Sequence, residues 1–136
     1  MNARSGPISL STVALWAAWL AALAVWTAAL LTPQPVQAAQ AVLPPEMEFP
    51  TAKTLHVGAY AFLTVLACRL PRGGPCRWLP LAVLSLHGLG TEYLQQFVES
   101  RCGCWQDVGL DHAGIALGLL VGWTGGRKTE AADGAP

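Results

Sequence analysis

The chain has 136 residues, of which 53% are hydrophobic and only 12% charged, and eight Lys and Arg balance eight Asp and Glu. Soluble domains carry about a quarter charged residues, so this composition is typical of a membrane protein. A neutral chain without a basic tract lacks the electrostatic footprint of a nucleic-acid-binding protein, and we expect no nucleic-acid partner. The apolar content also excludes intrinsic disorder.

An uncharged segment near the N-terminus predicts a first transmembrane helix. Residues 8–31 contain no charged residue and follow a short N-terminal segment, 1–7, that we place in the cytoplasm. As a helix, 8–31 would be about 36 Å long, which is enough to cross a hydrocarbon core of about 30 Å. A cleaved secretory signal peptide is the alternative, because Arg4 precedes the segment and small residues follow it. Its apolar part would be unusually long for a signal peptide.

The rest of the chain predicts three more transmembrane helices. Residues 32–52 contain five prolines and predict an extracytoplasmic loop. Apolar segments follow at 53–70, 78–98 and 108–124, and residues 125–136 form a polar tail. We therefore expect an all-α membrane protein, an antiparallel bundle of about four transmembrane helices.

The distribution of basic residues predicts the orientation of this bundle. With both termini in the cytoplasm, Lys53 and Arg101 are the only basic residues outside. Basic residues are enriched in cytoplasmic segments of membrane proteins. The chain is therefore predicted to be a multi-pass protein of the bacterial cytoplasmic (inner) membrane. The inside residues are Arg4, Arg69, Arg72, Arg77, Arg127 and Lys128.

Polar side chains lie near the predicted outer ends of the last three segments. Such residues are expensive in a bilayer and usually face the interior of a bundle. The outer ends of antiparallel neighbours are adjacent, so we expect one cluster, in which Glu92 is ionised and paired with Arg101 or Lys53. The cluster is a candidate functional or ligand-binding site, or alternatively a structural network that sets helix register. Its members are Lys53, His56, Tyr60, Glu92, Gln95, Arg101, Asp107 and Asp111.

Two further patterns predict packing within the bundle. Gly114, Gly118 and Gly122 repeat every four residues and form a small-residue ridge that permits close helix packing. His87 lies in the middle of an apolar segment, where a hydrogen bond across helices is expected.

The sequence contains no compact catalytic or metal-ligand motif. HExxH and GxSxG are absent, and the four cysteines at 68, 76, 102 and 104 do not form two CxxC pairs. We therefore assign no catalytic residue, no metal and no cofactor from the sequence.

Four motifs in order resemble the VanZ-like family of small bacterial membrane proteins, over about residues 50 to 122. The resemblance implies a polytopic inner-membrane protein, and the family's namesake is associated with low-level resistance to teicoplanin. The chain departs from the family pattern beside Arg101, where it has Glu99-Ser100 and the insert Cys102-Gly103-Cys104-Trp105. The motifs are Lys53-x-x-His56-x-x-x-Tyr60, Glu92-x-x-Gln95-x-Phe97, Arg101, and Asp107-x-x-x-Asp111-x-x-Gly114-x-x-x-Gly118.

Three functions fit these patterns. The first is a non-enzymatic envelope protein that contacts membrane lipid and binds an amphipathic, lipid-linked or peptide ligand at the outer leaflet. The second is a membrane-embedded hydrolase or transferase, in which His56, Glu92, Asp107 and Asp111 supply acid and base groups or bind a metal. The third is a transporter, for which four helices are few.

Overall fold

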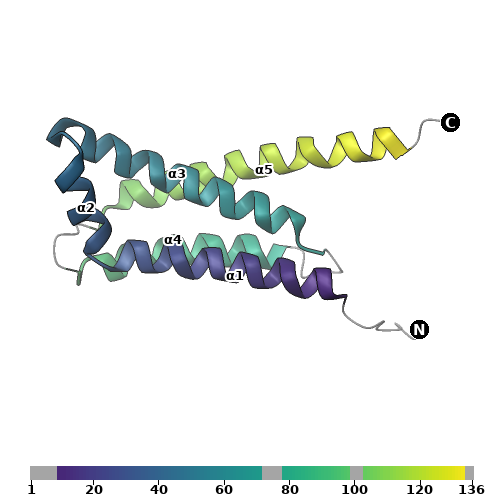
Figure 1. Ribbon diagram of the computed structural model, residues 1–136, viewed down its shortest axis with the longest axis horizontal. Helices are drawn as coiled ribbons and strands as arrows, with labels where there is room; N and C mark the ends of the chain where they lie inside the picture. Colours follow the sequence, from purple (N-terminus) through teal and green to yellow (C-terminus); the bar gives the residue numbers. More distant parts are fainter. Residues whose placement is uncertain (1–8, 72–77, 99–102, 134–136) are drawn as a thin grey trace.

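The computed structural model describes residues 9–71, 78–98 and 103–133, with side chains as far as 122. Within these residues the protein is all-α, and its four long helices run in alternating directions (Figure 1). A short helix crosses one end of the bundle, and α1 begins at the opposite end, where α5 finishes (Figure 1). The helices are α1 (Leu10–Leu31), α2 (Gln34–Val42), α3 (Pro45–Arg69), α4 (Leu79–Gln95) and α5 (Trp105–Asp133).

The prediction that residues 32–52 form a loop is wrong, because most of these residues are helical. The nine-residue helix α2 lies within it, and α3 begins at Pro45 rather than at Lys53. Pro35 and Pro45 lie in the first turns of these helices, where a missing amide hydrogen has no intrahelical partner to lose. Pro50 lies inside α3 and removes one intrahelical hydrogen bond without ending the helix.

The other predicted segments coincide with helices. The ends of α1 and α4 lie within three residues of the predicted ends, whereas α3 begins eight residues early and α5 ends nine residues late. Ser9 caps α1, because its hydroxyl accepts a hydrogen bond from the amide of Thr12 at 3.2 Å. At the other end of the chain, α5 continues to Asp133, so most of the predicted tail at 125–136 is helical.

Helices α3 and α5 form the most extensive contact, along the glycine ridge. A Cβ atom added to Gly114 would lie 2.5 Å from the carbonyl oxygen of Val57, and one added to Gly118 would lie 2.5 Å from that of Ala61. A Cβ on Gly122 would lie 2.8 Å from Cys68 Sγ. The ridge therefore lets the two backbones approach more closely than any side chain would permit.

Among the described helices, α1 alone is long and apolar enough to cross a membrane by length and composition. It has 22 residues, and its most apolar window has a mean hydropathy of 1.9. A signal sequence near an N-terminus has the same properties. Helix α4 has only 17 residues, and α3 and α5 are less apolar than α1.

Apolar side chains cover much of the outside of the bundle, and polar ones lie inside. Each long helix exposes large apolar residues, for example Val25, Phe62, Leu86 and Leu120, which are between 57% and 70% exposed. The apolar core is built around residues such as Trp19, Leu63 and Leu84. The buried polar residues are His56, Thr64, Thr91, Glu92, Gln95 and Asp111.

Candidate functional site

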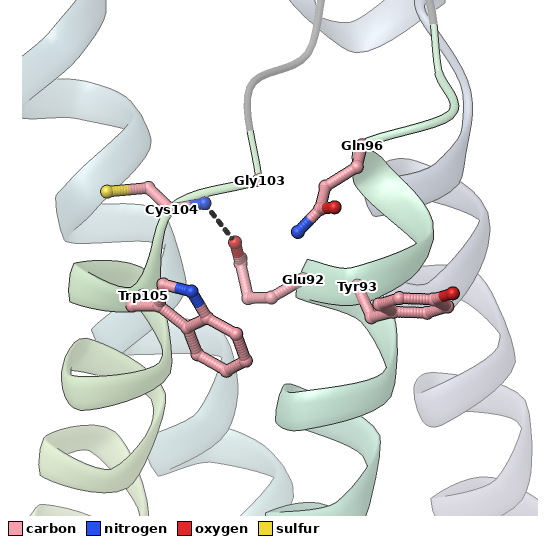
Figure 2. Close-up of a pocket in the computed structure, with 6 residues that line it drawn as sticks. All are labelled: Glu92, Tyr93, Gln96, Gly103, Cys104 and Trp105. Atoms are coloured by element: carbon pink, nitrogen blue, oxygen red, sulfur yellow. Dashed lines mark hydrogen bonds between the residues drawn. The ribbon is translucent and has the colours of Figure 1, made fainter.

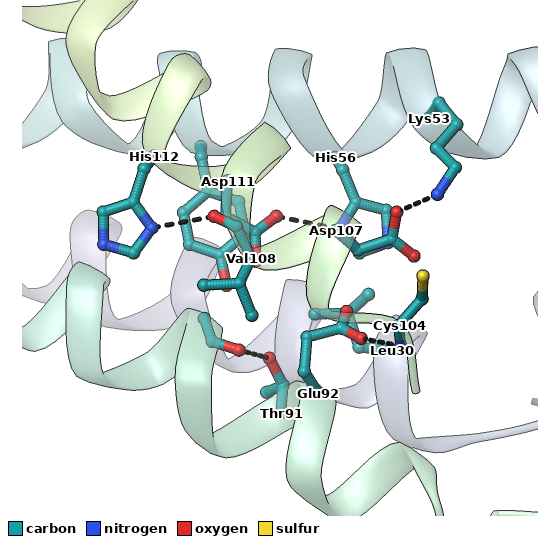
Figure 3. A network of polar contacts seen from close by, with 12 residues as sticks. Leu30, Lys53, His56, Thr91, Glu92, Cys104, Asp107, Val108, Asp111 and His112 are labelled. Carbon is teal, nitrogen blue, oxygen red and sulfur yellow. Dashed lines mark hydrogen bonds and ion pairs between the residues drawn. The ribbon is translucent and has the colours of Figure 1, made fainter. Parts of the chain in front are cut away.

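Three helices contribute to the predicted polar cluster, which lies toward the α2 end of the bundle (Figures 1 and 3). Helix α3 supplies Lys53, His56 and Tyr60, α4 supplies Glu92 and Gln95, and α5 supplies Asp107 and Asp111. These side chains lie where the three helices face one another. The eighth predicted member, Arg101, lies outside the described residues.

Two polar contacts join α3 to α5 one helical turn apart. The Lys53 ammonium group forms an ion pair with the Asp107 carboxylate, and both side chains are partly exposed. Deeper in the bundle, His56 Nδ1 lies 2.8 Å from Asp111 Oδ1 and donates to it, and both side chains are buried. Figure 3 shows the two contacts side by side. The close approach of α3 and α5 at the glycine ridge brings these four residues within reach of one another.

The structure gives Glu92 a different partner from the expected cation. Its Oε2 atom accepts a hydrogen bond from the backbone N–H of Cys104 at 2.8 Å, at the start of α5. Lys53 pairs with Asp107 instead, so the predicted pairing of Lys53 with Glu92 is wrong. The alternative partner, Arg101, lies outside the described residues.

His56, Glu92 and Asp111 form a compact group of possible metal ligands. Each offers one ligand atom, and these three atoms lie within 4.8 Å of one another. All three residues are buried, and Glu92 Oε1 and Asp111 Oδ2 have no hydrogen-bond partner. The sequence assigned no metal, but its hydrolase alternative named these three residues, together with Asp107, as acid and base groups or metal ligands. The structure brings His56, Glu92 and Asp111 together, whereas Asp107 pairs with Lys53.

Tyr60 belongs to a chain of hydrogen bonds that reaches α1, and its hydroxyl also lies near the Asp111 carboxylate. Its hydroxyl lies 2.8 Å from His87 Nδ1, and His87 Nε2 lies 2.8 Å from the Thr27 hydroxyl. Thr27 in turn donates to the carbonyl of Leu23 at 2.7 Å. His87 Nε2 therefore donates to Thr27, and Nδ1 accepts from Tyr60. The predicted hydrogen bond of His87 across helices is confirmed, and sequence reasoning missed Thr27, the polar residue on α1 that completes it.

Helix α1 covers one side of the cluster. The Trp26 ring packs edge-on against the His56 ring, with centroids 5.8 Å apart. Gln95 donates to the carbonyl of Leu30 at 3.3 Å, and Trp19 donates to that of Leu63 at 3.1 Å. The Trp26 indole nitrogen is buried without a partner. The α1 residues among these lie in the uncharged stretch 8–31, whose polar side-chain groups belong to two serines, two threonines and three tryptophans.

A shallow hollow opens beside Glu92, between the end of α4 and the start of α5. Its empty volume is about 160 Å³, part of it open to the outside. Figure 2 shows the Glu92 side chain between the Trp105 ring and the Gln96 amide. A Cβ on Gly103 would lie 2.3 Å from the Glu92 carbonyl oxygen, so a glycine is needed where the link crosses α4. The lining residues are Glu92, Tyr93, Gln96, Gly103, Cys104 and Trp105.

Comparison of the chain with protein-family models, with curated proteins and with solved structures found no match. The resemblance to the VanZ-like family therefore remains a prediction from the motifs.

Proposed function

We propose that the chain is a VanZ-like, multi-pass protein of the bacterial inner membrane, with α1, α3, α4 and α5 as its transmembrane helices. The proposal is supported by the apolar side chains that all four helices expose and by the polar residues buried between them. This is the polarity expected of a helical bundle surrounded by lipid, where polar groups face the interior.

The lengths of the helices are compatible with this proposal. On α3, the stretch between Lys53 and Arg69 contains no other charged residue and is about 24 Å long. The long side chains of lysine and arginine reach outward to the membrane interface and extend this span. The alternating helix directions are consistent with both termini on one side, as the basic residues predict.

We further propose that the polar cluster at the outer end binds the polar head of an amphipathic ligand. The hollow beside Glu92 is the observation that carries this proposal. A carboxylate next to an indole ring suits the ammonium group of a zwitterionic lipid, because the carboxylate supplies charge and the ring supplies an apolar, electron-rich face. Trp105 is 71% exposed and is free to contact a ligand at this position. The hollow is too shallow to enclose a headgroup, so the ammonium group would bind at its mouth beside the exposed Trp105 ring, and the acyl chains would lie against the outside of the bundle.

Native mass spectrometry of the detergent-purified protein tests this function. The protein is mixed with equal amounts of phosphatidylethanolamine and phosphatidylglycerol, and we expect it to retain the zwitterionic lipid. Glu92→Gln should weaken that retention, whereas Glu46→Gln, which changes an exposed residue of α3, should leave it unchanged. Equal retention of both lipids, or equal retention by both variants, would refute headgroup binding at the hollow.

A cellular assay tests the link to the VanZ-like family. We expect a host that expresses the chain to tolerate more teicoplanin than the empty host, and Glu92→Gln to reduce this tolerance at equal protein level in the membrane. If the expressing host and the empty host tolerate the same teicoplanin concentration, the chain does not confer resistance.

One observation favours an enzyme as a second candidate. A histidine next to two buried carboxylates is an arrangement used for acid and base catalysis and for metal-assisted hydrolysis. Incubating the protein with lipid phosphates and esters, followed by mass spectrometry of the products, tests this candidate. It requires a product that forms with the unmodified protein and not with His56→Ala.

A further inference from the structure

We propose that His56, Glu92 and Asp111 bind one divalent transition-metal ion inside the bundle. The three residues project from α3, α4 and α5 into one buried position, and their ligand atoms lie within 4.8 Å of one another. This metal site shares Glu92 with the ligand site proposed above, but it needs no lipid, and its test changes His56, which the lipid test leaves unchanged.

The first argument is the lack of partners for two carboxylates. Glu92 is 2% exposed and Asp111 is 0% exposed, and each has one oxygen without a hydrogen bond. Polar atoms buried without a partner are rare in native proteins, and such atoms commonly bind an ion or an ordered water. Two neighbouring buried carboxylates favour an ion, since a cation satisfies both oxygens and offsets both charges.

The second argument is that Lys53, the basic residue of the cluster that the structure describes, already forms an ion pair with another carboxylate. Lys53 pairs with Asp107 on the more exposed side of the cluster. Within the described residues, neither Glu92 nor Asp111 forms an ion pair with a lysine or an arginine. A divalent ion would balance the two carboxylates, with His56 as a neutral ligand.

The third argument is the geometry. Two ligand atoms bound to one tetrahedral Zn²⁺, each about 2.1 Å away, are about 3.4 Å apart. His56 Nδ1 and Asp111 Oδ1 are 2.8 Å apart, so they can bind one ion once the ion replaces the hydrogen bond between them and the imidazole carries its proton on Nε2. The remaining separations are at most 4.8 Å, so Glu92 must move toward the other two ligands by no more than about 1.4 Å to reach the tetrahedral spacing.

Neighbouring groups hold each ligand in place. The Trp26 ring packs against the His56 ring, and the Cys104 N–H holds the second oxygen of Glu92. A Cβ on Gly88 would lie 2.9 Å from Asp111 Oδ2, so the backbone of α4 closes the space behind that carboxylate. Contacts of this kind orient ligands and raise the affinity of metal sites.

The ligand set indicates which ion the site prefers. Calcium and magnesium prefer oxygen ligands alone, whereas an imidazole nitrogen with two carboxylates suits Zn²⁺, Mn²⁺ or Fe²⁺. For a given nitrogen and oxygen site, affinity rises from Mn²⁺ to Cu²⁺ and falls again at Zn²⁺, which still binds more tightly than Mn²⁺. We therefore expect Zn²⁺ to bind more tightly than Mn²⁺, and Mg²⁺ to bind weakly. Three protein ligands also leave at least one coordination position open.

Metal analysis of the full chain tests the proposal. The protein is purified in detergent, stripped with a chelator, and titrated with Zn²⁺, and the bound metal is measured by mass spectrometry after gel filtration. We expect one Zn²⁺ per chain. His56→Ala should weaken binding at least about 100-fold, because even loss of a group that only orients a ligand costs 10- to 100-fold. His112→Ala is the matched control, since it removes a nearby imidazole that binds Ser85 and Val108 instead.

Two results would overturn the proposal. One is folded protein that takes up no stoichiometric Zn²⁺, and the other is equal binding by His56→Ala and the unmodified chain. Cobalt substitution in the unmodified protein provides a readout that needs no variant to fold. Nitrogen and oxygen ligands give weak visible bands without a sulfur-to-cobalt charge-transfer band. A strong charge-transfer band would assign the metal to a cysteine and contradict the proposed ligands.

Discussion

Replacing Gly114 by alanine should separate α3 from α5 at the middle of their contact. The added Cβ would lie 2.5 Å from the carbonyl oxygen of Val57 and 2.9 Å from the Cβ of Tyr60. An ordinary van der Waals contact to that oxygen is at least about 0.9 Å longer, so the helix backbones must move apart. Because the obstacle is backbone, a change of side-chain rotamer cannot relieve it.

The expected loss of stability follows from comparison with Gly109→Ala in the same helix. Gly109 has no atom within 4 Å of an added Cβ, so this variant gains only the helix propensity of alanine, up to about 1 kcal/mol. Gly114→Ala has a similar gain and, in addition, a cost of overpacking of about 1 to 3 kcal/mol. The free energy of unfolding of Gly114→Ala should therefore be lower than that of Gly109→Ala by about 1 to 3 kcal/mol.

Unfolding by added SDS in mixed micelles, followed by circular dichroism, measures this difference. Equal stability of the two variants would mean that Gly114 does not lie against α3. It would also undermine the His56–Asp111 contact, which depends on the same close approach of the two helices.

Two further predictions concern the hydrogen-bond chain and the topology. Tyr60→Phe should lower the free energy of unfolding by about 1 to 3 kcal/mol, because His87 Nδ1 loses its buried donor. Tyr93→Phe, which changes an exposed residue, should leave the free energy of unfolding almost unchanged. If the two variants lower it equally, the Tyr60 hydroxyl does not belong to a buried hydrogen-bond network. In single-cysteine variants, a membrane-impermeant thiol reagent applied to intact spheroplasts should label Cys104 but not Ser9→Cys. Labelling of Ser9→Cys alone would reverse the proposed orientation, and labelling of both would contradict a bundle that crosses the membrane.

The residues that belong together in the candidate site were recognisable without coordinates. Charged and amide side chains are costly in apolar helices, so Glu92, Asp107 and Asp111 were conspicuous in their segments. The spacing of Lys53 and His56 placed both on one face of a helix. All-α architecture likewise follows from long apolar segments separated by breaks, because helix formation depends largely on local composition.

The frequency of proline led to a wrong prediction of secondary structure at residues 32–52. The prolines of 32–52 predicted a loop, but Pro35 and Pro45 lie in first turns, where proline is compatible with a helix. A proline breaks or starts a helix according to its position in that helix, and composition alone does not define this position.

The pairing of side chains in the cluster depends on tertiary structure. The glycine ridge brings α5 against α3, so that Lys53 forms an ion pair with Asp107. Glu92 accepts a hydrogen bond from the Cys104 amide instead. The grouping of His56, Glu92 and Asp111 requires three helices to meet at one depth, and Trp26 reaches His56 only because α1 packs over them. Spacing along one helix specifies which residues share a face. Which faces meet is set by backbone contacts between segments far apart in the sequence, and no local pattern contains that information.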